Sequence, residues 1–371
     1  MSTAHRSAGQ ATGLGAPQAI WLVAEREIAS KLRSKAFVIS TAILLLGALA
    51  LVIWGGFQAA NQSGTPVAVT ADAQQYVEGL PGLEVTDVAD KAAAEALVED
   101  GTVDAAVVGD SSSPTGFTVV ADDSAPTQLL LSLAQLPPVE LLNPDGSEAA
   151  ALGYIAAIGF GIVFLLAASL FGGTIAQSVV EEKQTRVVEL LISAIPVRSL
   201  LAGKVIGNTI LAMGQILVLA SIAIIGLTVT DQTALLQGLG APIAWFAIFF
   251  LFGFILLASL FAAAASMVSR QEDIGSTTMP ITMLIMAPYF LVIFFNDNPL
   301  VLAIMSYVPF SAPVGMPMRI FLGQAQWWEP LLSLVILVAT CVAAILVAAR
   351  IYQNSLLRMG GRVKLTEALA G

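Results

Sequence analysis

Long stretches without charged residues dominate the pattern of this chain. Residues 36–56 are entirely uncharged, and comparable stretches recur five more times before the C-terminus. About 20 apolar residues in a helix cross a hydrocarbon core roughly 30 Å thick. Because lipid offers no partners for backbone N–H and C=O groups, such stretches must be helical. We therefore predict six transmembrane helices, over residues 36–56, 152–178, 199–229, 241–269, 279–295 and 330–350.

The connection between the first two spans has a different pattern. Residues 57–151 contain short alternating or β-branched segments that predict strands over 66–71, 82–88, 103–108 and 117–121, with helices over 92–99 and 128–136. The predicted fold class is therefore an α-helical polytopic membrane protein, with six transmembrane helices and a small extracytoplasmic α/β domain between helices 1 and 2. Composition agrees, since 57% of the residues are hydrophobic and only 11% are charged.

The distribution of charge predicts the orientation. The net charge of −10 hides 15 acidic residues against one basic residue in residues 57–151. Of the 16 Lys and Arg residues, all but Lys91 and Arg319 lie in the N-terminal segment, the second-to-third and fourth-to-fifth connections and the C-terminal tail. The positive-inside rule then places both termini in the cytoplasm, in a multi-pass protein of the cell membrane. Residues 1–17 read as a disordered tail and residues 351–371 as a cytoplasmic tail.

Two flanking segments have helical patterns. In residues 18–35, Trp21, Ala24, Ile28 and Leu32 share one face of a basic helix, which we expect to lie along the membrane interface, with packing on the bundle as the alternative. Residues 296–328 are apolar but contain four prolines, so we expect short, partly re-entrant helices on the outer side.

The second span continues into a charged amphipathic segment. Residues 179–198 are predicted to form a cytoplasmic helix that is continuous with the span. Val187, Leu190, Leu191 and Ala194 share its apolar face, and charged residues dominate its first two turns.

Several kinds of chemistry are excluded. Gly203-Lys204 lacks the flanking residues of a phosphate-binding loop. The only histidine is His5 and the only cysteine is Cys341, so we predict no catalytic, cofactor-binding or metal site in this chain. No span interior carries Asp, Glu, Lys or Arg, which argues for an external energy source. Asn208 and Gln215 share a face of the third span, and we interpret them as interhelical hydrogen-bonding residues.

Three segments carry a family resemblance. Residues 180–204 read VEEKQTRVVELLISAIPVRSLLAGK, residues 269–273 read SRQED and residues 305–319 read MSYVPFSAPVGMPMR. Together with the six spans and the external insert, they resemble the type-2 (ABC-2) exporter permeases of ATP-binding cassette transporters, and within them the sodium-efflux-type branch.

The resemblance implies a role for the cytoplasmic segment. Its helix would be the coupling helix that docks on an ATPase subunit, which would bind ATP and Mg²⁺ in place of this chain. The implied contact residues are Glu181, Glu182, Lys183, Arg186 and Glu189, with a second contact at Arg270, Glu272 and Asp273. A second permease copy or a related permease would complete the pathway. The implied activity is export of a substrate from the cytoplasm by alternating access.

Other classes of function stay open at this point. A membrane-anchored sensor or scaffold would use the acidic external domain to bind a ligand, and an ion-coupled transporter would work without ATP. We expect the lipid bilayer as a partner and no nucleic acid. The 15 external acids favour solubility at the membrane surface over cation collection.

Overall fold

The computed structural model describes residues 15–60, 64–80, 82–122, 126–133, 145–229, 233–358 and 363–370. The chain divides into a helical unit, Met1–Ala50 with Asp145–Gly371, and a smaller unit, Leu51–Pro144. Most of the predicted tail 1–17, and the later part of the helix predicted over 128–136, lie outside the described residues.

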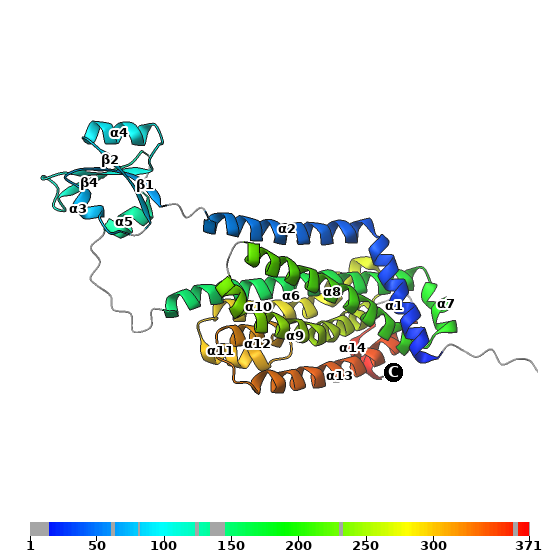
Figure 1. Cartoon of the computed structure of the whole chain (residues 1–371). Coiled ribbons are helices and arrows are strands. Elements are labelled where there is room, and N and C mark those ends of the chain that lie inside the picture. Colours follow the sequence, from blue (N-terminus) through cyan, green and yellow to red (C-terminus); the bar gives the residue numbers. More distant parts are fainter. Residues whose placement is uncertain are drawn as a thin grey trace, which may run out of the picture. The chain divides into compact units, whose positions relative to one another are not determined.

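The helical unit is a bundle of long apolar helices with shorter helices at its two ends (Figure 1). Its long helices are α6 (Asp145–Gln184), α8 (Val197–Val229), α9 (Thr233–Ser266), α10 (Ile274–Phe294) and α13 (Glu329–Ser355). A sixth long helix, α2 (Lys35–Ala60), belongs to this unit up to Ala50 and contacts α6 through Phe37 and Phe171. The shorter elements of the unit are α1 (Ala16–Arg33), α7 (Val187–Ala194), the 3-10 turn η1 (Gln271–Asp273), α11 (Pro299–Tyr307), α12 (Ala312–Phe321) and α14 (Leu365–Ala370).

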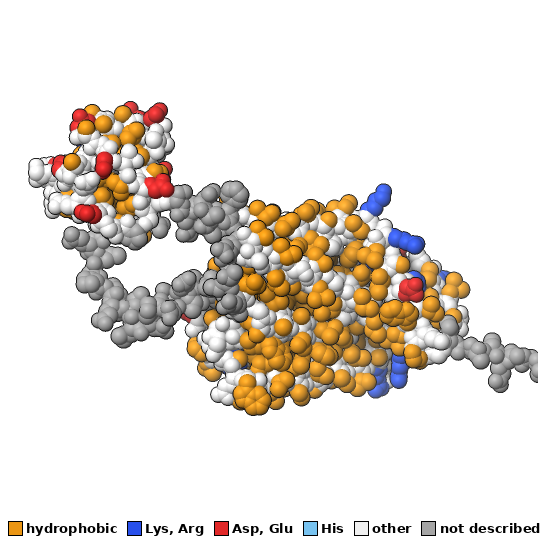
Figure 2. Space-filling model, viewed as in Figure 1, with side chains coloured by type: hydrophobic (Ala, Val, Ile, Leu, Met, Phe, Trp, Pro, Cys, Tyr) orange, Lys and Arg blue, Asp and Glu red, His pale blue; other side chains and the backbone are white. Residues whose placement is uncertain are grey.

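Six of the described helices are long and apolar enough to cross a membrane, which confirms the predicted fold class. The candidate spans are Lys35–Trp54, Tyr154–Gln184, Val197–Val229, Gly238–Ser266, Gln271–Phe294 and Glu329–Ser355. Hydrophobic side chains cover most of the visible face of the bundle (Figure 2). Several spans are longer than predicted, and the second one now includes the charged residues 181–183.

Aromatic side chains hold α6 against the centrally placed α9. Three ring pairs follow one another along the two helices: Phe160 with Phe246, Phe164 with Phe250, and Phe171 with Phe254. Their ring centroids are 5.0, 5.9 and 5.8 Å apart, within the range of favourable aromatic contacts. These pairs fill the core that positions the ends of α6 and α9.

The smaller unit is a four-stranded sheet with helices against it. Its strands are β1 (Thr65–Thr70), β2 (Leu83–Val88), β3 (Ala105–Gly109) and β4 (Phe117–Val120), in the order β2-β1-β3-β4, with β4 antiparallel and the rest parallel. Its helices are α3 (Gln74–Val77), α4 (Lys91–Glu99) and α5 (Thr127–Leu133). Val67 and Val69 of β1 enter one core and Ala68 the other, as the two-residue period of a strand requires. The predicted α/β domain is confirmed.

The helix predicted over residues 18–35 packs on the bundle, as the alternative interpretation expected, and its position relative to the membrane interface stays a prediction. α1 lies against α8 and buries Ala19, Val23, Ala24 and Glu27. Trp21 and Leu32, two members of the predicted apolar face, are more than half exposed. Ala24, a third member of that face, is buried, so the contact with α8 includes one edge of the predicted apolar face together with Ala19, Val23 and Glu27.

The proline-rich segment 296–328 contains the two short helices α11 and α12. Asn298 caps α11 by accepting hydrogen bonds from the backbone N–H groups of Leu300 and Val301. α12 packs against α6 and α9, and its residues 312–319 are all buried. Prolines at helix starts and at the breaks separate the two helices.

Candidate functional site

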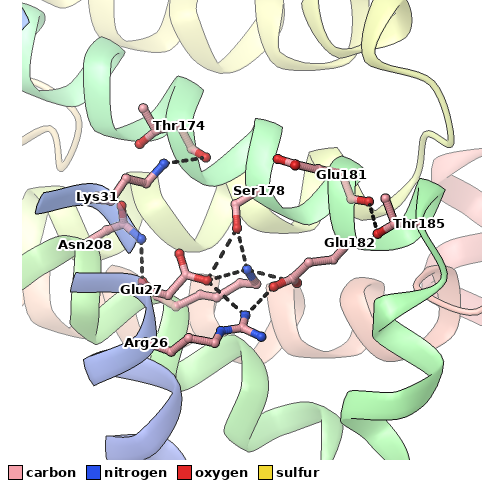
Figure 3. Close-up of polar contacts among 10 residues, drawn as sticks. Arg26, Glu27, Lys31, Thr174, Ser178, Glu181, Glu182, Thr185 and Asn208 are labelled. Atoms are coloured by element: carbon pink, nitrogen blue, oxygen red, sulfur yellow. Dashed lines mark hydrogen bonds and ion pairs between the residues drawn. The ribbon is translucent and has the colours of Figure 1, made fainter. Parts of the chain in front are cut away.

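Four charged side chains, of which two are buried and two are partly buried, meet where α1, α6 and α8 converge, at the end of the bundle that carries α7 and α14, called here the α7 end (Figures 1 and 3). The Lys204 ammonium is fully buried and lies 2.7 Å from Glu27 Oε1 and 3.0 Å from Glu182 Oε2. It also donates to Ser178 Oγ at 2.6 Å. Arg26 pairs with the same two acids. We call Arg26, Glu27, Glu182 and Lys204 the buried charge cluster; its charges balance, and it joins three helices.

Two glycines allow α1 to approach α8 closely enough for these contacts. A Cβ atom on Gly203 would lie 2.4 Å from Val23 Cβ, and one on Gly207 would lie 2.8 Å from the Ala24 carbonyl oxygen. Glycines four residues apart on one helix face let backbones come close in membrane helices. Lys204, one residue after Gly203, thereby reaches Glu27 on the facing helix.

The cluster changes the ionisation of α1 side chains. Burial raises the pKa of Glu27, but Lys204 and then Arg26 lower it more, so that this pKa lies below its ordinary value of 4.5. Burial lowers the pKa of Arg26, but Glu182 and Glu27 together raise it above its ordinary value. Burial lowers the pKa of Lys31, whose ammonium donates to the Thr174 carbonyl at 3.4 Å. Glu27 is therefore ionised at neutral pH despite its burial.

Lys183 is a second fully buried lysine and has a different role. Its ammonium donates to the carbonyl oxygens of Ser266 at 2.8 Å and Ser355 at 2.9 Å. These are the last residues of α9 and α13, where helix carbonyls lack partners and carry partial negative charge. One side chain of α6 thus holds the ends of two other spans.

The prediction that residues 179–198 form one helix continuous with the second span is wrong. α6 ends at Gln184, and Arg186 adopts a left-handed conformation with φ 57° before α7 begins at Val187. A left-handed residue is a common helix terminator, although glycine usually occupies it. α7 is consequently a separate short helix set between the ends of α6 and α8.

The five predicted contact residues divide into two groups. Glu181, Arg186 and Glu189 are exposed at the α7 end. Glu182 and Lys183 are not on this surface, because Glu182 belongs to the buried charge cluster and Lys183 is fully buried. Sequence spacing could not separate the groups, since helix packing decides which side of α6 faces inward.

α7 itself is amphipathic, but its exposed side is partly apolar. Val188 is fully buried, whereas Leu190 is 74% exposed and Val187 is also exposed. The exposed side of α7 therefore combines the apolar Val187 and Leu190 with the charged Arg186 and Glu189.

The second predicted contact lies on the connection between α9 and α10. Arg270 and Glu272 are exposed and form an ion pair of 3.1 Å, and Asp273 is partly buried at the start of α10. The turn η1 packs against α6, so this connection lies beside the α7 end.

Lys183 and Lys204 are buried near the α7 ends of two candidate spans, Tyr154–Gln184 and Val197–Val229, outside the uncharged stretches that form the span interiors. The predicted interhelical hydrogen bonds of α8 are absent from the described residues. Asn208 donates to the Lys204 carbonyl of its own helix, and neither amide atom of the buried Gln215 has a protein partner.

A further ion pair, which the sequence did not predict, lies at the opposite end of the bundle. Arg319 of α12 is buried and contacts Glu329 of α13 at 3.0 Å and Ser306 of α11 at 3.0 Å. Tyr307 donates to the same carboxylate at 2.9 Å, and burial raises the pKa of Tyr307. These contacts join the two short helices to the last span.

Glu27 and Lys204 were also missed by sequence reasoning. The available signal was the spacing of Ala19, Val23 and Glu27 on one face of α1, together with the two glycines around Lys204. Within the described part of the chain, no group of three or more His, Cys, Asp or Glu side chains is arranged to hold a metal ion.

Comparisons with known proteins bear on this arrangement. A family model described as "ABC-2 family transporter protein" matches residues 35–350. The chain is 27% identical over 203 residues to the uncharacterized protein YhaP of Bacillus subtilis, covering 52% of this chain and 48% of that protein. It is 29% identical over 210 residues to the uncharacterized protein MJ1024 of Methanocaldococcus jannaschii, covering 56% and 51%. The chain thus spans about half the length of these curated relatives. No solved structure matches it.

Proposed function

The chain belongs to the ABC-2 family of transporter proteins, and from this premise we propose that it is the permease subunit of an ATP-binding cassette exporter. A separate ATPase subunit binds ATP and Mg²⁺ and drives alternating access, so that a substrate leaves the cytoplasm. The protein lies in the cell membrane, with the α7 end and both termini in the cytoplasm. The concentration of Lys and Arg in the segments at that end supports this orientation.

The observation that carries the proposal is the position of α7. This helix presents Leu190 and the charged side chains of Arg186 and Glu189 on the surface, while Val188 holds it to the bundle. α7 connects α6 directly to α8, two candidate spans. A force applied to α7 therefore acts on both spans at once.

The buried contacts at the α7 end supply the rigidity that such coupling needs. The buried charge cluster fastens the end of α6 to α8 and α1, and Lys183 fastens it to the ends of α9 and α13. Movement of the ATPase would then be passed to the bundle as a rigid-body tilt. The connection between α9 and α10, with Arg270, Glu272 and Asp273, is the second contact in this proposal.

Two finer parts of the proposal concern assembly and substrate. A second copy of this chain, or a related permease, completes the pathway. The loop of residues 180–204 supports the sodium-efflux-type branch, and ATP-driven sodium uptake into inverted membrane vesicles tests it. Uptake that does not respond to ATP would remove sodium from the proposal.

Site-specific photo-crosslinking tests the coupling surface. Leu190 is replaced by p-benzoylphenylalanine in the full chain, and irradiated membranes of the source cells are searched for adducts by mass spectrometry. We expect an adduct with a protein that contains a phosphate-binding loop. The matched control carries the photo-reactive residue at Trp327, which is 83% exposed at the opposite end of the bundle, and should give no such adduct.

A charge introduced at Leu190 gives an independent test of the contact between α7 and the ATPase. Leu190→Asp should lower the amount of ATPase that co-purifies with the chain by about tenfold, which corresponds to roughly 1.4 kcal/mol of contact energy. Leu357→Asp, at an exposed leucine just beyond α13, should leave the amount unchanged. If neither experiment detects an ATPase, the exporter proposal fails and a sensor or scaffold function becomes the better hypothesis.

A further inference from the structure

A long groove lies on the outside of the bundle between α8 and α13. α9 forms its floor, and Ala16 and Ile20 of α1 lie at its mouth. Its volume is about 1150 Å³, above the roughly 300–1,000 Å³ of pockets that enclose small ligands. Its walls are mainly aliphatic and include Val205, Ile210, Leu251, Ile255, Ile345 and Leu346.

The mouth of this groove has the opposite character. Arg198, in the first turn of α8, and Arg350, near the end of α13, both line it and are both exposed. No acidic residue is among the lining residues, and neither arginine forms an ion pair with any residue that the structure describes. The N-terminal end of α8 adds a partial positive charge. The mouth therefore attracts an anion.

The length of the groove along α8 is close to the thickness of one membrane leaflet. Arg198 and Ile210 are 12 residues apart on α8, which corresponds to about 18 Å along the helix axis. Half of a hydrocarbon core is roughly 15 Å. With the arginines at the membrane surface, the aliphatic walls extend through the region of the acyl chains.

We propose that this groove is a binding site for an anionic phospholipid. The phosphate lies between Arg198 and Arg350, and an acyl chain follows the aliphatic walls toward Ile210. Two unneutralised arginines favour a headgroup with net negative charge over a zwitterionic one, whose own cation would meet them. This site is independent of the proposed export function, because it uses none of the exposed residues of α7.

Lipid titration of the purified full chain tests this site. The delipidated protein in detergent is titrated with dioleoyl phosphatidylglycerol or dioleoyl phosphatidylcholine, and bound lipid is measured by native mass spectrometry. We expect the wild type to prefer phosphatidylglycerol on the order of tenfold. Arg198→Gln with Arg350→Gln should reduce this preference to less than about twofold.

Two further variants separate charge from shape. Arg270→Gln with Arg358→Gln removes two exposed arginines that already have the acidic partners Glu272 and Glu367, and it should keep the preference. Ala202→Phe places a bulky side chain in the groove and should weaken the binding of both lipids.

Three results would overturn the proposal. The first is an unchanged preference in the Arg198→Gln, Arg350→Gln variant. The second is complete competition by inorganic phosphate, which would indicate a site for free phosphate alone. The third is efficient disulfide formation between two copies carrying Leu346→Cys, which would make this face an interface between protein chains.

Discussion

At the residue scale, the members of the buried charge cluster stabilise the protein only as a set. Glu27 and Lys204 are almost completely withdrawn from water, and each carries a charge whose solvation has been lost. Breaking a buried pair by removing one partner is far more costly than the net contribution of the pair, because the remaining charge is left without compensation. Single and double variants should therefore behave differently.

Lys204→Met should destabilise the protein strongly, by about 3–5 kcal/mol, because it leaves Glu27 and Glu182 facing each other without the ammonium. Glu27→Gln should also destabilise, and the double variant should be less destabilised than the sum of the two. Thermal unfolding of the purified protein in detergent measures all three.

An exposed ion pair provides the control for this cycle. Lys91 and Glu95 of α4 lie 3.6 Å apart and are both largely exposed. Glu95→Gln should change stability by less than about 1 kcal/mol. Equal effects at Glu95 and Glu27 would contradict a special role for burial.

The pH dependence of stability follows from the lowered pKa of Glu27. Ionised Glu27 stabilises the folded state above its unfolded-state pKa, and this contribution is lost as the pH falls through the lower folded-state pKa. The wild type should therefore have a higher thermal midpoint than Glu27→Gln. This difference should have its full size at pH 7 and should shrink below about pH 4.5. A difference that stays constant down to pH 3 would show that Glu27 acts through packing alone.

At the scale of elements, the contact between α1 and α8 depends on close backbone approach. Gly207→Val should separate the helices, because its Cβ would already lie 2.8 Å from the Ala24 carbonyl. Overpacking of this kind costs about 1–3 kcal/mol and should also weaken the pair between Glu27 and Lys204. Faster proteolysis within α1 and a lower thermal midpoint are the expected results.

The matched control lies on the same helix. A Cβ on Gly214 of α8 would meet nothing within 4 Å. Gly214→Val should therefore leave the contact with α1 intact. Both variants place valine in α8, so the difference between their thermal midpoints measures the effect of the close approach to α1 and not the helix propensity of valine. A Gly207→Val protein as stable as Gly214→Val would contradict the proposed packing.

The elements also illustrate what sequence patterns can and cannot predict. The two-residue alternation of PVAVT predicted β1, because strand side chains alternate between the two cores of the small domain. The break at Arg186 was not predicted, because arginine rarely takes a left-handed conformation and no glycine or proline marks the site. The buried state of Glu182 and Lys183 was missed because it depends on neighbours from α1, α9 and α13.

At the scale of the whole molecule, hydropathy was sufficient to predict the number of spans but not the contacts between them. An uncharged stretch such as residues 36–56 must become a helix in lipid whatever surrounds it. Lys204 could not be placed in the same way, because Glu27, one of the two acids that neutralise it, is 177 residues away in the sequence. Composition therefore predicted the elements, and the site required the tertiary structure.

The last prediction concerns the orientation of the whole molecule. Cys341 is replaced by Ser, and single cysteines are introduced at Trp327, 83% exposed, or at Leu357, at the opposite end. Because 14 of the 16 Lys and Arg residues lie in segments assigned to one side, Leu357 should face the cytoplasm. A membrane-impermeant maleimide should label Trp327→Cys in intact cells, and Leu357→Cys only after permeabilisation. The reverse pattern would place α7 outside the cell, where no ATPase could reach it.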